Sequence, residues 1–294
     1  MSAAAKDKGK LYVVATPIGN LEDISYRAVR ILREADLIAC EDTRQSRKLL
    51  EHYGIEKPTV SYHDHNEQQR AHELTIKLQE GLSIAQVSDA GMPGISDPGY
   101  RLVKLAIEQG IPVVPIPGAS ALVSALAASG LPTDTFEFRG FLPAKSGQRR
   151  TALESLREVQ HTTIFYETPH RILESLQEIT GILGAGRQVV IARELTKLHE
   201  EFMRGTAGEI LKSLDGRELR GEITLLIGKA ETVEPAARGK DLPTRLKEIM
   251  ELEQLDEKAA LKMLAKEHGL SKSELYRELQ RVQSHQQHKP KPQR

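Results

Sequence analysis

The stretch LSIAQVSDAGMPGISDPGYRLVKLAIEQG, residues 82–110, shows most directly how the first part of the chain folds. It begins with an apolar run, passes through a segment rich in glycine and proline, and ends with apolar residues at helical spacing. Asp97 stands at the expected N-cap, and Pro98 suits the first helical position because its missing N–H is not needed there. The stretch therefore predicts a strand, a loop and a helix, which is one unit of an α/β fold.

The same alternation continues on both sides of this stretch. Strands are expected over residues 11–16, 36–40, 58–62, 82–88 and 111–116, and helices over 25–35, 43–54, 66–81, 97–110 and 121–130. Short strands alternating with helices need crossover connections, which indicates a largely parallel sheet. A second α/β unit is expected after a boundary rich in glycine and proline at 118–132. Its strands are expected at 135–141, 162–166, 188–195 and 222–228, and its helices from about 151, at 169–183 and at 207–214.

The fold class is thus α/β, with two α/β domains followed by a helical module. The boundaries we expect are a disordered arm at 1–10, domains at 11–122 and 123–230, a polar linker at 231–243, a helix-turn-helix-like module at 244–284 and a disordered tail at 285–294.

Composition limits the partners and the compartment. Lys and Arg total 41, and Asp and Glu total 41, so the chain has no global basic field and any nucleic-acid contact needs a local patch. The single cysteine, Cys40, excludes an internal disulfide and fits a reducing compartment. No stretch is apolar enough for a membrane span or a secretory signal, so we expect a cytoplasmic protein without a membrane partner.

Five loops follow the strands of the first predicted sheet: TPIGN (16–20), CEDTR (40–44), YHDHN (62–66), SDAGMPG (88–94) and IPGAS (116–120). In open α/β sheets, ligands bind beyond the carboxyl ends of the strands. Gly91, Gly94 and Gly118 would let the backbone approach a ligand closely. Each loop alone favours an ordinary turn between strand and helix, but three loops with glycine and proline at one predicted edge indicate a pocket. TPIGN lacks the G-x-G-x-x-G spacing of dinucleotide sites, and the chain has no P-loop motif.

Two further regions predict contact with RNA. FRGFLPAKSGQRR, residues 138–150, is basic and aromatic, and Lys145, Arg149 and Arg150 are its candidate phosphate contacts. The alternative is a solvated interdomain loop.

The C-terminal segment AALKMLAKEHGLSKSELYRELQR, residues 259–281, has apolar stripes on both sides of a turn at Gly269, with Ser271 as a cap. This pattern is typical of a helix-turn-helix, with Lys272 and Arg277 as basic positions on its second helix. The alternative is a helical packing or dimerisation module.

Six motifs in order carry a resemblance to a known family: YVVATPIGNLEDIS, CEDTRQS, SDAGMPGISDPG, PIPGASA, FYETPHRI and GEITLLIG. They resemble the tetrapyrrole-methylase-type (class III) S-adenosylmethionine methyltransferases. Within that family the chain is most similar to bacterial enzymes that methylate the ribose 2′-oxygen of a cytidine in 16S ribosomal RNA. The resemblance implies S-adenosylmethionine as methyl donor, no metal, the small ribosomal subunit as partner, and a homodimer.

The resemblance also implies which residues hold the cofactor between the two domains. By motif they are Pro17, Ser88, Asp89, Ala90, Gly94, Ile95, Ser120, Ala121, Glu167, Leu195 and Ile223. One departure is that related small-molecule methylases often have Gly-Asp-Pro where this chain has Ser-Asp-Ala.

Methyl transfer to a hydroxyl requires a group that takes up the proton. The first candidate is His63, with Asp42 as another, and Arg44 could hold an RNA phosphate. The alternative for His63 is a loop histidine with a structural role. Two other functions remain open. One is a tetrapyrrole or corrin C-methyltransferase, and the other is a ligand-sensing helix-turn-helix regulator without catalytic activity.

Overall fold

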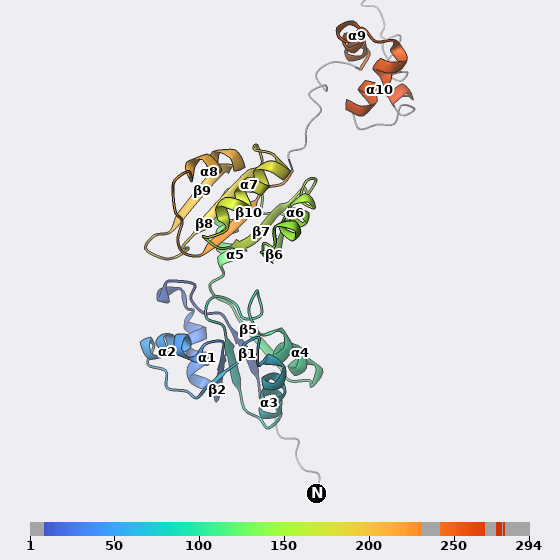
Figure 1. Cartoon of the computed structure of the whole chain (residues 1–294). Helices are drawn as coiled ribbons and strands as arrows, with labels where there is room; N and C mark the ends of the chain where they lie inside the picture. The colour runs from blue at the N-terminus through green and yellow to red at the C-terminus, as the bar shows by residue number, and fades with distance from the viewer. Residues whose placement is uncertain (1–8, 231–241, 268–274, 278, 280–294) are drawn as a thin grey trace, which may run out of the picture. The chain divides into compact units, whose positions relative to one another are not determined.

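The computed structural model describes residues 9–230, 242–267, 275–277 and 279 (Figure 1). Five strands form the first sheet: β1 (Leu11–Val14), β2 (Leu37–Cys40), β3 (Thr59–Ser61), β4 (Ile84–Val87) and β5 (Val113–Ile116). Their order is β3-β2-β4-β1-β5 and every pair is parallel. The carboxyl ends of all five strands therefore meet at one edge, which brings the five predicted loops together.

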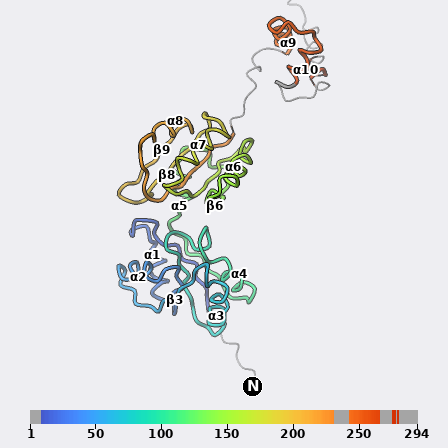
Figure 2. Tube along the Cα trace, in the orientation of Figure 1, coloured from blue at the N-terminus to red at the C-terminus, as the bar shows by residue number. Residues whose placement is uncertain are grey.

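Helices cover both faces of this sheet (Figures 1 and 2). α1 (Tyr26–Glu34) and α2 (Thr43–His52) pack on one face, and α3 (Glu67–Gln79) and α4 (Tyr100–Glu108) pack on the other. A 3-10 turn, η1 (Leu21–Asp23), leads into α1. The hydroxyl of Ser25 caps α1 by accepting the backbone N–H of Ala28 at 3.1 Å. The apolar residues at helical spacing thus point into two cores, one on each side of the sheet.

The second sheet is mixed. It contains β6 (Phe136–Phe141), β7 (Thr162–Glu167), β8 (Gln188–Arg193), β9 (Glu201–Thr206) and β10 (Ile223–Ile227), in the order β6-β7-β10-β8-β9. β6 and β7 are parallel, and the other pairs are antiparallel. α5 (Ala121–Ser129) packs on one face, and α6 (Ser146–Glu154), α7 (Ile172–Leu183) and α8 (Ala207–Ser213) pack on the other.

Four details differ from the sequence predictions. β9 was not predicted, because EFMRGT has few apolar residues and continues directly into α8. α6 begins at Ser146 rather than near 151, so residues 138–150 form a strand, a short connection and a helix instead of a flexible loop. The boundary predicted after residue 122 falls inside α5, which packs on the second sheet. α4 begins at Tyr100 with Gly99 at its N-cap, so Asp97 does not cap that helix.

The C-terminal unit contains α9 (Leu242–Leu252) and α10 (Glu257–Glu267), and residues 275–277 are helical. The predicted apolar stripes lie in its core, where Leu261, Leu264, Leu275 and Leu279 are buried with Ile249. The predicted turn at 268–274, with Gly269, Ser271 and Lys272, lies outside the described residues, as do residues 1–8, 231–241 and 285–294.

The predicted N-terminal arm and linker both end one or two residues too late. Gly9 is packed against the first sheet's helices, since its N–H donates to the carbonyl of Leu78 at 2.8 Å. α9 likewise begins at Leu242, inside the predicted linker. No helix in the described part of the chain combines the length and the apolar character that a membrane crossing needs.

Candidate active site

Two loops at the carboxyl edge of the first sheet are joined by backbone hydrogen bonds. The N–H of Thr16 donates to Gly91 O at 2.9 Å, and the N–H of Gly91 donates to Thr16 O at 3.1 Å. The Thr16 hydroxyl also donates to Ser88 O at 3.1 Å. Gly91 has a φ of 80°, a left-handed conformation that glycine adopts without steric cost. The loops after β1 and β4 are therefore fixed relative to each other.

The loop after β5 is held against the end of β1 by close packing. A Cβ built on Gly118 would lie 2.9 Å from the Cβ of Ala15, so a larger residue would push this loop away. Ser120 occupies the N-cap position of α5 but its side chain makes no capping hydrogen bond. Its hydroxyl is therefore available to a ligand.

A cavity of about 320 Å³ lies between these loops and the second sheet. Its volume is within the range of small-molecule sites, which are mostly apolar with a few polar groups. The first sheet's loops and α5 contribute Ile18, Ala90, Gly91, Met92, Ile95, Ser96, Asp97, Ser120 and Ala121. The second sheet and the segments adjoining its strands contribute Phe141, Tyr166, Glu167, Thr168, Pro169, Ala192, Leu195, Gly221, Glu222, Ile223 and Thr224.

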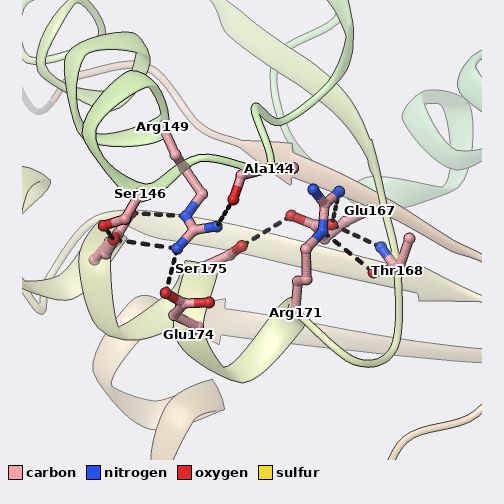
Figure 3. A network of polar contacts seen from close by, with 9 residues as sticks. Ala144, Ser146, Arg149, Glu167, Thr168, Arg171, Glu174 and Ser175 are labelled. Carbon is pink, nitrogen blue, oxygen red and sulfur yellow. Dashed lines mark hydrogen bonds and ion pairs between the residues drawn. The ribbon is translucent and has the colours of Figure 1, made fainter.

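The carboxylate of Glu167 orders one wall of this cavity (Figure 3). It accepts the N–H of Thr168 at 2.7 Å, the guanidinium of Arg171 at 2.5 Å and the hydroxyl of Ser175 at 2.8 Å. Its side chain is 0% exposed, so its charge is compensated inside the protein. The network fixes the turn between β7 and α7, which carries Thr168 and Pro169 on the cavity wall.

Comparison with known proteins identifies the fold and the family. A family model described as Tetrapyrrole (Corrin/Porphyrin) Methylases matches residues 10–211, which is more than half of the chain. This chain belongs to the tetrapyrrole methylase family. Among curated proteins, "Ribosomal RNA small subunit methyltransferase I" of Halalkalibacterium halodurans is 50% identical over 92% of this chain and 94% of that protein. The protein of the same name from Synechocystis sp. is 47% identical over 91% of this chain and 96% of that protein.

Solved structures with the same fold are more distant in sequence. A uroporphyrin-III C-methyltransferase from Thermus thermophilus, complexed with S-adenyl homocysteine, has a TM-score of 0.54 at 18% identity. The match covers 75% of this chain and 97% of that one. A diphthine synthase has a TM-score of 0.54 at 14% identity, covering 75% of this chain and 90% of that chain. These likenesses establish the tetrapyrrole methylase fold.

Most of the predicted cofactor residues line the cavity of this tetrapyrrole methylase. They are Ala90, Ile95, Ser120, Ala121, Glu167, Leu195 and Ile223. Pro17, Ser88, Asp89 and Gly94 do not line it. Ser88 is buried in the loop, and the Oδ1 of Asp89 accepts the N–H of Asp42 at 3.1 Å. Asp89 therefore connects the loops after β2 and β4 but does not itself line the cavity.

The structure does not bring the three predicted catalytic residues, His63, Asp42 and Arg44, to the cavity wall. Asp42 caps α2 and pairs with Arg44 at 2.8 Å, and these contacts hold the pKa of Asp42 at about 2. His63 follows the edge strand β3, and its Nε2 lies 3.2 Å from the amide nitrogen of Asn66. The Asn66 amide N–H can donate to this ring nitrogen and occupy the lone pair that a base needs, so His63 is poorly placed as a base.

Arg149 was predicted to contact RNA, but in the structure it is buried in an ion-pair network. Its side chain is 1% exposed and pairs with Glu178 at 2.8 Å and with Glu174 at 2.5 Å, which ties α6 to α7 (Figure 3). A guanidinium used in this way cannot reach a phosphate. Lys145, Arg150 and Arg277 are exposed, whereas Lys272 lies outside the described residues.

Sequence reasoning missed several polar groups on the cavity wall, above all Asp97, Tyr166 and Glu222. Burial and then the negative charge of Glu41 raise the pKa of Asp97 to about 6, although a hydrogen bond with Ser88 opposes the shift. The signal was present, because Asp97 lies in the same glycine- and proline-rich stretch as the cofactor motif. The Asp-Pro pair predicts that Asp97 caps the following helix, whereas in the structure the N-cap of α4 is Gly99.

Proposed function

We propose that this chain transfers a methyl group from S-adenosylmethionine to the ribose 2′-oxygen of a cytidine in 16S ribosomal RNA. The chain is an S-adenosylmethionine-dependent ribosomal RNA methyltransferase, as its family and its relatives at about half identity over most of the chain indicate. The identity of the acceptor, the ribose 2′-oxygen of a cytidine, rests on the motif resemblance. The proposal depends mainly on one observation. The cavity between the two sheets is lined by residues from the motifs on which the family resemblance is based.

The residues of the cavity fit the donor. Small side chains at Ala90, Gly91, Ala121 and Ala192 leave backbone groups close to a ligand. The free Ser120 hydroxyl and the N-terminus of α5 suit a carboxylate, while apolar residues on both walls suit a purine ring. S-adenosylmethionine supplies an electrophilic methyl group on a positively charged sulfur. The remaining task of the protein is to align the acceptor hydroxyl and take up its proton.

For RNA, we infer that Lys145 and Arg150 at the start of α6 and Arg277 of the C-terminal unit contact phosphates. All three are exposed and basic, and a local basic patch is required because the net charge of the chain is zero. We further infer that the partner is 16S ribosomal RNA or the small ribosomal subunit and that the enzyme is a homodimer, and light scattering after size-exclusion chromatography would test the dimer directly.

One labelling experiment tests the function. The protein is incubated with methyl-labelled S-adenosylmethionine and either small ribosomal subunits, free 16S ribosomal RNA or a uroporphyrinogen substrate, and the labelled product is mapped. We expect label in one ribose of the small-subunit RNA. Label in the macrocycle would support a C-methyltransferase instead. Absence of label with every acceptor, together with specific binding to a DNA duplex, would support a regulator.

A further inference from the structure

Several phenylalanine and tyrosine side chains in the described part of the chain are exposed to solvent. They are Tyr26, Tyr100, Phe136, Phe141 and Tyr276. Phe141 is 53% exposed and lines the cavity, whereas the other four do not line it. A single exposed ring on a protein surface is ordinary, but a ring exposed on a cavity wall can contact a molecule that enters the cavity.

An irregularity in β6 turns Phe141 toward the cavity. Phe138 pairs with Ile164 and Phe141 pairs with Tyr166, so β6 advances by three residues while β7 advances by two. Gly140 has a φ of 67°, the left-handed conformation that glycine supplies at β-bulges. Because side chains alternate between the two faces of a strand, the extra residue places Phe141 on the same face as Phe138. Bulges beside active sites commonly re-aim a side chain in this way.

The ring of Tyr166 supports Phe141. The two ring centroids lie 5.6 Å apart with 64° between the ring planes, which is an edge-to-face contact. Phe138 contacts the same tyrosine ring at 4.9 Å. The Tyr166 hydroxyl makes a hydrogen bond with the backbone of Leu122 in α5, which fixes this ring. Phe141 therefore has a fixed neighbour and still leaves half of its surface open to a ligand.

Phe141 lies where the cavity meets solvent. The predicted donor contacts Leu195 and Ile223 are buried and adjoin β8 and β10, whereas β6 is an edge strand of the sheet. A Cβ built on Gly140 would lie 3.7 Å from the Oγ of Ser96, so the bulge faces the loop after β4. An acceptor as large as RNA has to approach from the solvent side, and Phe141 is exposed on that side.

The chain that continues from Phe141 is basic. Lys145 and Arg150 are exposed, and they follow Phe141 in the connection to α6 and in α6 itself. Sites for single-stranded nucleic acid combine these two features, because bases stack on aromatic rings while phosphates pair with cations. The segment from Phe141 to Arg150 has both.

We propose that Phe141 stacks against an unpaired base of the RNA acceptor and thereby positions the ribose hydroxyl at the donor. This proposal rests on the proposed function and deepens it by naming a residue that contacts the acceptor. Stacking uses the π-face of a base and so orients the nucleotide without reading its sequence. Loss of the ring should therefore weaken acceptor binding and leave donor binding intact.

The test compares Phe141→Leu and Phe141→Tyr with Phe136→Leu, which alters an exposed phenylalanine on the same strand outside the cavity. Single-turnover methylation is measured against the concentration of small ribosomal subunits, and affinity for S-adenosylhomocysteine is measured by calorimetry. We expect Phe141→Leu to raise the half-saturating subunit concentration on the order of 10-fold, because leucine is apolar but has no π-face. Phe141→Tyr keeps the ring and should stay within about threefold of the wild type. S-adenosylhomocysteine affinity should be unchanged in both, and the control should match the wild type.

A second measurement separates stacking from phosphate contact. Phe141→Leu removes no charge, so the affinity for 16S ribosomal RNA should fall at every salt concentration while its slope against log salt stays unaltered. A lower slope would contradict the proposal. Because Phe141 is half exposed, its replacement should leave folding intact, and urea unfolding checks this.

Three further results would overturn the proposal. An unchanged half-saturating concentration in Phe141→Leu excludes a contact with the acceptor. Equal losses in Phe141→Leu and Phe141→Tyr exclude stacking as the contact. A loss of S-adenosylhomocysteine affinity as large as the loss for the subunit assigns the ring to donor binding instead. A failure of the proposed function is visible separately, because the wild-type protein would then leave the RNA unlabelled.

Discussion

The first sheet lines the cavity with loops, whereas the second sheet lines it largely with residues on and just beyond its strands. On the first side, Thr16 and Gly91 hold the loops together through backbone hydrogen bonds, and Gly118 allows one loop to close on Ala15. On the second side, the carboxylate of Glu167 holds the wall through side-chain contacts. The first wall should therefore be sensitive to added volume, and the second to the loss of a buried charge pair.

The largest effect is expected from Glu167→Gln. The substitution leaves the Arg171 guanidinium without its anionic partner beside a fully buried site, so the free energy of unfolding should fall by about 3 kcal/mol. Urea unfolding measures the change. Glu34→Gln is the control, since it breaks an exposed pair with Arg30 and should cost less than about 0.5 kcal/mol. Equal losses in the two variants would mean that the Glu167 network does not hold the second wall.

Gly118→Val tests the first wall. The new side chain would collide with Ala15 and displace the loop that carries Ser120, so affinity for S-adenosylhomocysteine should fall on the order of 10²-fold. Calorimetry measures it. Gly147→Ala is the matched control, because a Cβ at that glycine meets nothing within 4 Å. Wild-type affinity in Gly118→Val would show that this loop does not contact the donor.

The same contrast explains what the sequence could predict. The first wall follows from local pattern: strands are apolar runs, the loops after them are rich in glycine and proline, and parallel strands bring those loops to one edge. The order of elements and most of their bounds were predicted on this basis. The cofactor residues on these loops, such as Ala90 and Ser120, came from the motifs and do line the cavity.

The second wall depends on long-range pairing that local pattern does not reveal. β10 lies between β7 and β8 although it comes last in the chain, so Tyr166 and Thr224 meet across strands far apart in sequence. The sequence does not reveal that Arg149 pairs with Glu178 on another helix. Without that pairing, the basic stretch at 138–150 has the pattern of an RNA contact. Asp97 was missed for a different reason: Asp-Pro is a common helix start, and only the structure shows that α4 begins later.

A smaller effect is expected on the pH dependence of protein stability, through Asp97 on the first wall of the cavity. The pKa of Asp97 is raised to about 6 in the folded protein, so between about pH 4 and 6 the folded state binds more protons than the unfolded state. Stability is therefore lost as pH rises through this window. Asp97→Asn should be more stable than the wild type by about 1 kcal/mol above pH 6, after allowance for its partial exposure, and equal to it below pH 4. Thermal unfolding at several pH values measures this, and a constant difference at all pH values would contradict it.

The smallest effect separates two neighbouring arginines of α6. Arg150 is exposed, so Arg150→Gln should leave folding unchanged and lower the slope of log affinity for 16S ribosomal RNA against log salt by about 1. Arg149 is paired inside the protein, so Arg149→Gln should lower the free energy of unfolding. In the protein that remains folded, it should leave the salt slope unaltered. Filter binding across salt concentrations and urea unfolding measure the two quantities. If Arg150→Gln leaves the slope unaltered as well, the start of α6 lies outside the RNA path, and the patch that compensates a net charge of zero must be sought on the C-terminal unit.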